Sequence, residues 1–168
     1  MLKFVEKIVQ ELERDGRFAQ ERLYVQHGDT SVYAHSISVA ETSLRLARKY
    51  RIKVNKYALV RAALLHDYFL YDWHVHEKGR AFHPTGHPEA ARKNAVEDYG
   101  VSELEQNIIA SHMFPLGHRM PHSKEAWIVT LADKICASRE IAAPRARKVN
   151  ARSFRFQDLI FRFLGQAF

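Results

Sequence analysis

The sequence predicts an all-α bundle of about seven to eight helices in one domain that spans residues 1–168. Three observations support this fold class. Apolar residues recur at the three- and four-residue spacing of a helix face along most of the chain. Helix-capping residues precede several of these segments, and glycine or proline follows them. We find no β-hairpin signal, and a chain of 168 residues is the usual size of one domain with its own core.

The N-terminal part contains three predicted helices. Residues 2–14 carry an apolar stripe on one helix face, and Asp15-Gly16 interrupts the pattern. Residues 17–26 have the pattern of a short second helix. The turn at residues 27–30 supplies a capping residue for a long third helix over residues 31–51.

The middle of the chain contains two predicted helices separated by a loop. Asn55 caps a fourth helix that runs through residues 66–67. Residues 71–86 have no periodicity, and long loops of this kind often carry function. Pro88 suits the first position of a fifth helix, which would place His87 at the helix cap.

A sixth helix follows after a short stop. Gly100 ends the fifth helix, and Ser102 and Glu105 have the spacing of a capping box. Residues 113–122 contain two prolines and a glycine, so we expect another loop there.

The C-terminal part contains two further predicted helices. One begins at Ser123 and ends before Pro144, and residues 151–164 form a last amphipathic helix within the basic segment 151–168. A surface helix with an apolar face on the core explains this pattern best. The alternative is a patch that contacts nucleic acid or a membrane surface.

Composition narrows the class of protein. The net charge of +7 favours contact with anions, such as a nucleotide, a nucleic acid or a membrane surface. The single cysteine excludes an intrachain disulfide. Apolar runs are too short to cross a bilayer, and the N-terminus lacks the apolar centre of a signal peptide. We therefore expect a cytoplasmic protein.

Ligand-type side chains point inward from four predicted helices. His35, His112 and Asp133 each continue an apolar stripe, and His66-Asp67 follow an apolar run. Buried imidazoles and carboxylates are costly unless they are paired or bind metal, and helix bundles build metal sites in this way. Mixed histidine and carboxylate ligation suits Fe, Mn, Zn, Co or Ni. The alternative is a set of core histidines that are hydrogen-bonded to carboxylates.

These positions resemble the HD superfamily, whose pattern is a His, an adjacent His-Asp and a distant Asp, each on a helix. The resemblance covers roughly residues 31–141. His87 and His112 resemble the two additional histidines of dinuclear members. The resemblance implies an HD-domain-like bundle that holds two divalent metal ions through His35, His66, Asp67, His87, His112 and Asp133.

The resemblance also implies a reaction. We expect a metal-dependent phosphohydrolase that acts on a nucleotide or another small phosphoester through a hydroxide bridging the two ions. Asp67 and His66 are the expected catalytic residues, with Asp67 bridging the ions. Two other classes remain open: an HD-fold di-iron oxygenase, and a non-catalytic metal-containing module that binds nucleic acid or a membrane surface.

The segment after the His-Asp pair departs from many members of the superfamily. Residues 68–74 read Tyr-Phe-Leu-Tyr-Asp-Trp-His in place of the Gly-Lys or nearby Lys of many members, which argues against a cyclic-di-GMP phosphodiesterase. His74, Lys78 and Arg80 are candidate contacts for substrate phosphate, or else solvated loop residues. Lys134 is likewise either a contact for substrate phosphate or a solvated charge. It neighbours Asp133 in sequence but points about 100° away from it on a helix.

Overall fold

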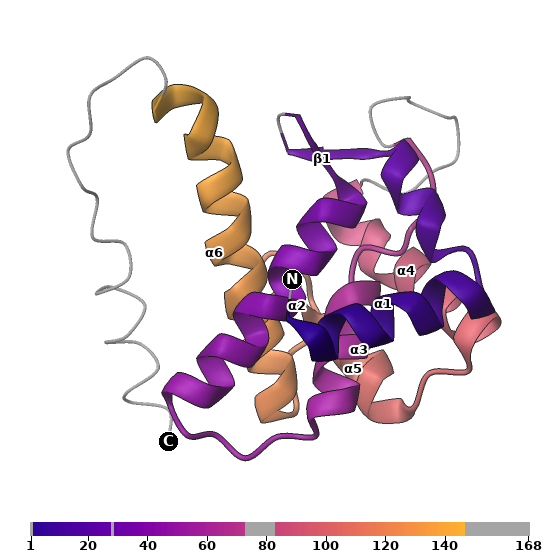
Figure 1. Cartoon of the computed structure of the whole chain (residues 1–168), viewed down its shortest axis with the longest axis vertical. Helices are drawn as coiled ribbons and strands as arrows, with labels where there is room; N and C mark the ends of the chain where they lie inside the picture. Colours follow the sequence, from indigo (N-terminus) through magenta and orange to yellow (C-terminus); the bar gives the residue numbers. More distant parts are fainter. Residues whose placement is uncertain (1, 28, 73–82, 147–168) are drawn as a thin grey trace.

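The computed structural model describes residues 2–27, 29–72 and 83–146 (Figure 1). Within these ranges the chain forms seven helices and one small two-stranded sheet, which confirms the predicted all-α bundle. The helices and strands of the first half are α1 (Lys3–Asp15), the 3₁₀ helix η1 (Phe18–Leu23), β1 (Val25–His27), β2 (Thr30–Ser31), α2 (Val32–Lys49) and α3 (Lys56–Leu65). Those of the second half are α4 (His83–Tyr99), α5 (Glu103–Ser111) and α6 (Lys124–Ala146).

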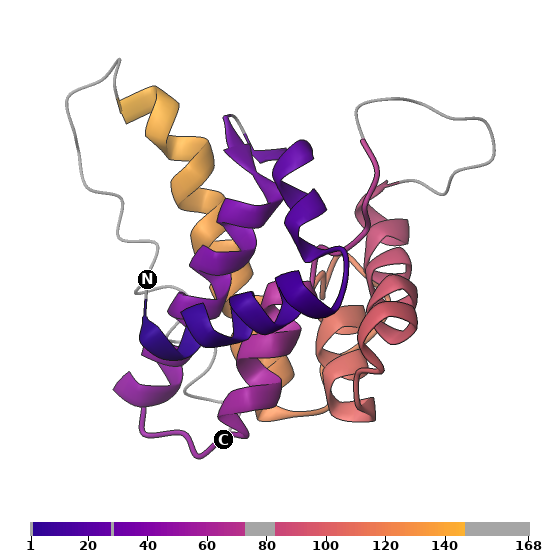
Figure 2. The ribbon, with the colours of Figure 1, turned by 45° about the vertical axis from the view of Figure 1, so that its right-hand side comes forward.

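The helices enclose a single core among the described residues. Helix α2 packs against α3 on one side and against α6 on the other, and α5 contacts α3, α4 and α6. Figure 2 shows α4 and α5 together on one side of the bundle, with α1 crossing in front of α2 and α3. The core is built from aliphatic side chains of every α-helix, including Ile8, Leu12, Val39, Leu59, Leu64, Ile108 and Val129.

Several predicted helix ends are confirmed. The Asn55 side chain accepts a hydrogen bond from the Ala58 amide at 3.1 Å, so Asn55 caps α3. Ser102 and Glu105 form the predicted capping box of α5. Gly100 ends α4 with a φ of 54°, a left-handed conformation that glycine adopts without steric cost.

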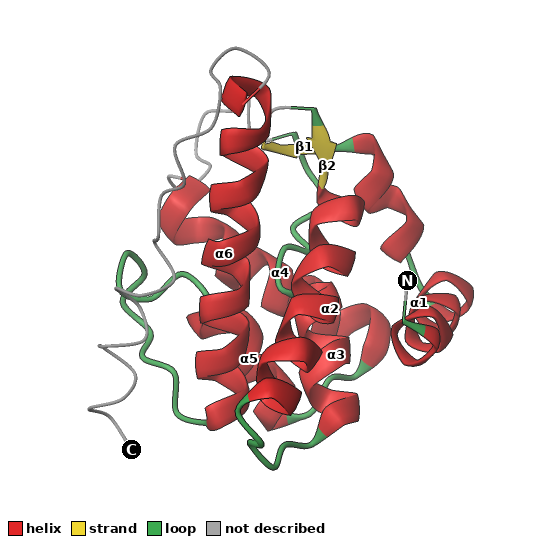
Figure 3. Cartoon of the chain, turned by 60° about the vertical axis from the view of Figure 1, so that its left-hand side comes forward, coloured by secondary structure: helices red, strands yellow, loops and turns green. Residues whose placement is uncertain are grey.

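The segment before α2 differs from the prediction of a helix over residues 17–26. Only Phe18–Leu23 is helical, and β1 and β2 follow as an antiparallel pair near the C-terminal half of α6 (Figure 3). Strands of three and two residues are too short to produce a detectable alternation, which explains why no hairpin was predicted. The cap of α2 is Ser31, directly after the predicted turn.

Two predicted boundaries at prolines are wrong. Helix α4 begins at His83, so Pro88 lies inside the helix and His87 is not its cap. A proline removes one backbone hydrogen bond, here close to the helix N-terminus, and burial of His87 and Ala91 against the bundle offsets that cost. Helix α6 likewise continues past the predicted stop before Pro144, as far as Ala146, the last residue that the structure describes.

The amphipathic helix predicted at residues 151–164 lies outside the described residues. In the part of the chain that the structure describes, none of the helices combines the length and the hydropathy needed to span a bilayer.

Candidate metal centre

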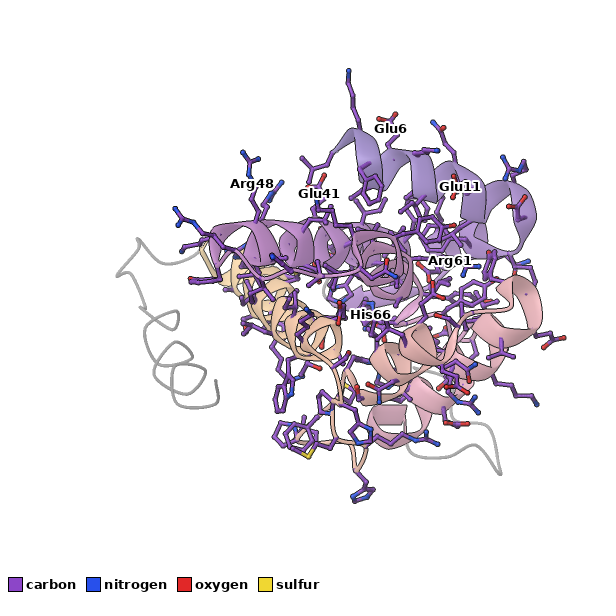
Figure 4. The ribbon with its side chains drawn as sticks, turned by 90° about the horizontal axis from the view of Figure 1, so that it is seen from below. Glu6, Glu11, Glu41, Arg48, Arg61 and His66 are labelled. Carbon is purple, nitrogen blue, oxygen red and sulfur yellow. The ribbon has the colours of Figure 1, made fainter. Side chains whose placement is uncertain are left out.

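The six predicted ligand residues come together in the interior of the bundle. They come from α2, the end of α3, α4, the end of α5 and α6, and each is at most 7% exposed. Figure 4 shows His66 in the middle of the bundle, whereas Glu6 and Glu41 lie at its edge. The six residues are His35, His66, Asp67, His87, His112 and Asp133.

One group of donor atoms surrounds the first carboxylate oxygen of Asp133. His35 Nε2 lies 3.1 Å from Asp133 Oδ1, and His66 Nε2 lies 3.8 Å from the same oxygen. The Oδ2 atom of Asp67 completes this group at 3.2 Å from His66 Nε2 and 3.8 Å from His35 Nε2. These four side chains therefore present two imidazole nitrogens and two carboxylate oxygens to one point.

A second group of donor atoms lies on the other side of Asp67. Its Oδ1 atom is 3.3 Å from His87 Nε2 and 3.4 Å from His112 Nε2. The two imidazole nitrogens are only 2.9 Å apart. Two donors at right angles around an ion, each roughly 2.1 Å from it, lie roughly 3.0 Å apart, so this spacing suits a shared cation. The two oxygens of Asp67 thus face two different pairs of histidines.

Hydrogen bonds at the far side of two histidine rings fix which nitrogen faces the centre. His66 Nδ1 donates to the Ala63 carbonyl and His112 Nδ1 donates to the Ile109 carbonyl, each at 2.8 Å. Both histidines are the C-caps of their helices, so each ring satisfies a carbonyl that the helix end leaves open. The Nε2 lone pairs consequently point to the centre, where the negative ends of two helix dipoles also favour a cation.

His35 is oriented by a carboxylate that the sequence analysis did not identify. Its Nδ1 lies 2.9 Å from Glu140 Oε2, while its Nε2 faces Asp133. Glu140 and Asp133 are seven residues apart on α6 and therefore share a helix face. A carboxylate behind a ligand histidine fixes its tautomer and raises its basicity, as in many metal sites.

The buried carboxylates of the centre favour positive charge beside them. Burial lowers the pKa of His35, but hydrogen bonds to Asp133 and Glu140 outweigh burial and raise it to about 9. Burial also opposes ionisation of Asp67, yet the adjacent His66 holds the pKa of that carboxyl well below its usual range. Burial lowers the pKa of His112 to about 3, which leaves its imidazole neutral.

Unpaired atoms at the centre also fit a metal. Among the described residues, His66 Nε2 and Asp67 Oδ1 are buried without a hydrogen-bond partner. Both atoms face the ligand groups described above. Imidazole nitrogen with carboxylate oxygen is a donor set that suits divalent transition metals. The residues present therefore fit the metal that was predicted from the sequence.

The segment directly after the His-Asp pair is held by a separate polar network. The Tyr68 hydroxyl donates to Asp98 Oδ2 at 2.5 Å, and the Arg17 guanidinium binds both oxygens of Asp98. The Asn94 side-chain amide donates to the backbone carbonyls of Tyr68 and Phe69. These contacts tie the chain beside Asp67 to α4.

Two further polar side chains near the centre were missed by the sequence analysis. Gln26 donates to Asp67 Oδ2, and Glu21 is 1% exposed with a pKa raised well above its usual range by burial. Both lie in the segment predicted as a helix, and we find no signal in the sequence that distinguishes them.

Of the residues considered as contacts for substrate phosphate, the structure describes Lys134 but not the three in the loop. His74, Lys78 and Arg80 lie outside the described residues. Lys134 reaches the centre: its Nζ donates to the His112 carbonyl at 3.0 Å and lies 3.7 Å from Asp133 Oδ2. The sequence analysis expected Lys134 to point away from Asp133, but its long side chain brings Nζ within 3.7 Å of that carboxylate.

Comparison with known proteins identifies the family. A family model described as HD domain matches residues 32–138, a range that includes all six predicted ligand residues. Searches of curated proteins and of solved structures find no match. The family and the two clusters of histidine and aspartate indicate a site for divalent metal. Because the match covers more than half of the 168 residues, this chain belongs to the HD domain family.

Proposed function

We propose that the protein is a phosphohydrolase that uses two divalent transition-metal ions (Fe, Mn, Zn, Co or Ni) to hydrolyse a nucleotide or another small phosphoester. Membership of a superfamily of metal-dependent hydrolases supports the reaction class. One observation carries the dinuclear assignment: Asp67 directs Oδ2 to the His35 and His66 side and Oδ1 to His87 and His112.

The ligand roles follow from these distances. His35, His66 and Asp133 would hold the first ion, His87 and His112 the second, and Asp67 would bridge them. When bound, such a pair of ions activates water at neutral pH and neutralises charge on the phosphoryl oxygens. The protein's own contribution is to hold six donors rigidly in a buried site, each on a helix or at a helix end.

Lys134 is the described cation best placed to bind a phosphate oxygen. One of its three donors is used on the His112 carbonyl, and its side chain remains 33% exposed. Burial lowers its pKa, and Asp133 partly opposes that shift. We propose that the remaining donors of Lys134 orient the phosphoryl group and stabilise the charge that develops on it.

The test is a screen for phosphate release. Metal-stripped protein is reloaded with each candidate metal and incubated with a panel of nucleotides and other phosphoesters, while oxygen consumption is recorded. Asp67→Asn keeps the shape of the side chain but removes its charge, and we expect it to lose at least about 100-fold in turnover. Glu6→Gln is the matched control, because Glu6 lies on the exposed side of α1.

Two outcomes would contradict the proposal. Oxygen consumption by the iron-loaded protein without phosphate release would assign the site to an oxygenase. Salt-dependent binding of nucleic acid with no turnover of any compound would indicate a binding module instead.

A further inference from the structure

The short β1–β2 pair delivers one side chain to the metal centre. Val25 pairs with Ser31 and His27 pairs with Thr30, with an irregularity between Val25 and His27, so Gln26 has no partner on β2. Irregularities of this kind redirect side chains and are common beside active sites. Val25 is 45% exposed, whereas Gln26 is only 7% exposed and turns into the bundle.

Gln26 contacts the carboxylate that faces both histidine pairs. Its Nε2 donates to Asp67 Oδ2 at 2.5 Å. The same oxygen lies 3.2 Å from His66 Nε2. A carboxylate oxygen has two lone pairs, so it can accept this hydrogen bond and still bind a cation. The contact therefore restricts rotation of the Asp67 carboxylate without blocking its ligand role.

The amide at this position also preserves the charge of the centre. A lysine or arginine beside Asp67 would neutralise the carboxylate and repel a divalent cation, whereas a neutral amide does neither. Hydrogen bonds to ligand carboxylates and histidines typically change metal affinity by about 10–100-fold when they are removed.

We propose that Gln26 is a positioning residue that holds the Asp67 carboxylate in the orientation in which its two oxygens serve two metal ions. This inference rests on the dinuclear centre of the proposed function. It assigns a role to the β1–β2 pair, because this pair brings a residue from before α2 to the ligand at the end of α3.

The test compares Gln26→Met with Gln20→Met. Methionine has nearly the length of glutamine but no N–H donor, and Gln20 is an exposed residue of η1 six positions earlier. Binding of Mn²⁺ to metal-stripped protein is measured by titration calorimetry, and electron paramagnetic resonance reports whether two bound Mn²⁺ ions are magnetically coupled. Melting in EDTA separates loss of packing from loss of metal binding.

We expect Gln26→Met to weaken Mn²⁺ binding by about 10–100-fold and to reduce the coupled signal, while Gln20→Met matches the wild type. Gln26→Ala, which removes the donor without placing a thioether against the carboxylate, is expected to show the same loss. Wild-type affinity and coupling in either Gln26 variant, even with a lower melting temperature in EDTA, would overturn the proposal.

The readout also separates this inference from the proposed function. Mn²⁺ binding and coupling require no turnover, so a wild-type protein that binds two coupled ions but hydrolyses nothing contradicts the hydrolase and not the role of Gln26. Conversely, normal metal binding with impaired hydrolysis in Gln26→Met contradicts the role of Gln26 alone.

Discussion

Replacement of His87, one of the second pair of histidines, tests whether hydrolysis requires both metal ions. His87 Nε2 lies 3.3 Å from Asp67 Oδ1 and 2.9 Å from His112 Nε2, on the side of Asp67 away from His35 and His66. We therefore predict that His87→Ala retains about one ion per chain and loses at least about 100-fold in turnover. That loss corresponds to about 2.7 kcal/mol of transition-state stabilisation.

The backbone should tolerate this change. His87 is the fifth residue of α4 and is not its cap, and alanine has the highest helix propensity. The assay is paired measurement of metal per chain and phosphate release. His66→Ala is the comparison variant, because His66 Nε2 lies near carboxylates of both Asp67 and Asp133. We expect this variant to lose the first ion and to disorganise the second.

Two results would refute this reasoning. Near wild-type turnover by His87→Ala with one ion bound would mean that a single metal suffices and that the centre acts as a mononuclear site. Loss of both ions in His87→Ala would mean that the two groups of ligands assemble as one unit.

Three further predictions concern the surroundings of the ligands. Glu140→Ala should weaken metal binding by about 10-fold or more, whereas Glu140→Gln, which keeps an acceptor for His35 Nδ1, should recover most of it, as calorimetry can show. In metal-stripped protein the pKa of His35 is raised from 6.5 to about 9, so the folded state favours the protonated imidazole. This contribution to stability is fully present below pH 6.5 and is lost as the pH rises through 9. Melting in EDTA should therefore fall between pH 6.5 and 9.5, while metal affinity, which requires loss of that proton, should rise; an unchanged melt would contradict the assignment. Tyr68→Phe removes the 2.5 Å hydrogen bond to Asp98 and should cost about 1.5–3 kcal/mol in denaturant unfolding, whereas Tyr57→Phe, at a tyrosine that is 46% exposed, should cost under about 0.5 kcal/mol.

The inward direction of three candidate ligand residues was predictable from the sequence, because the helix repeat fixes which face a side chain lies on. His35, His112 and Asp133 each continue an apolar stripe, so their inward orientation follows from the helix repeat alone. The capping box of Ser102 and Glu105 was predictable for a similar reason, since both partners lie within one turn. Local rules thus predicted the helical bundle and the inward direction of these side chains, whereas His87 was included because of the family resemblance.

The residues behind the ligands depend on contacts between distant segments. Glu140 shares a helix face with Asp133, but its partner His35 lies 105 residues away in sequence. Gln26 reaches Asp67 from a strand of three residues that leaves no periodic signal. The start of α4 was predicted wrongly, because packing of the helix overrides the usual preference of a proline such as Pro88 for the first turn of a helix.

A stepwise metal titration tests most directly whether the protein is a hydrolase that needs two bound ions. Mn²⁺ is added stepwise to metal-stripped protein, and bound metal per chain and phosphate release from the best substrate of the panel are measured in the same samples. The dinuclear arrangement around Asp67 predicts that most of the activity appears as the second ion binds. Full activity at one bound ion, or no phosphate release with two ions bound, would contradict it.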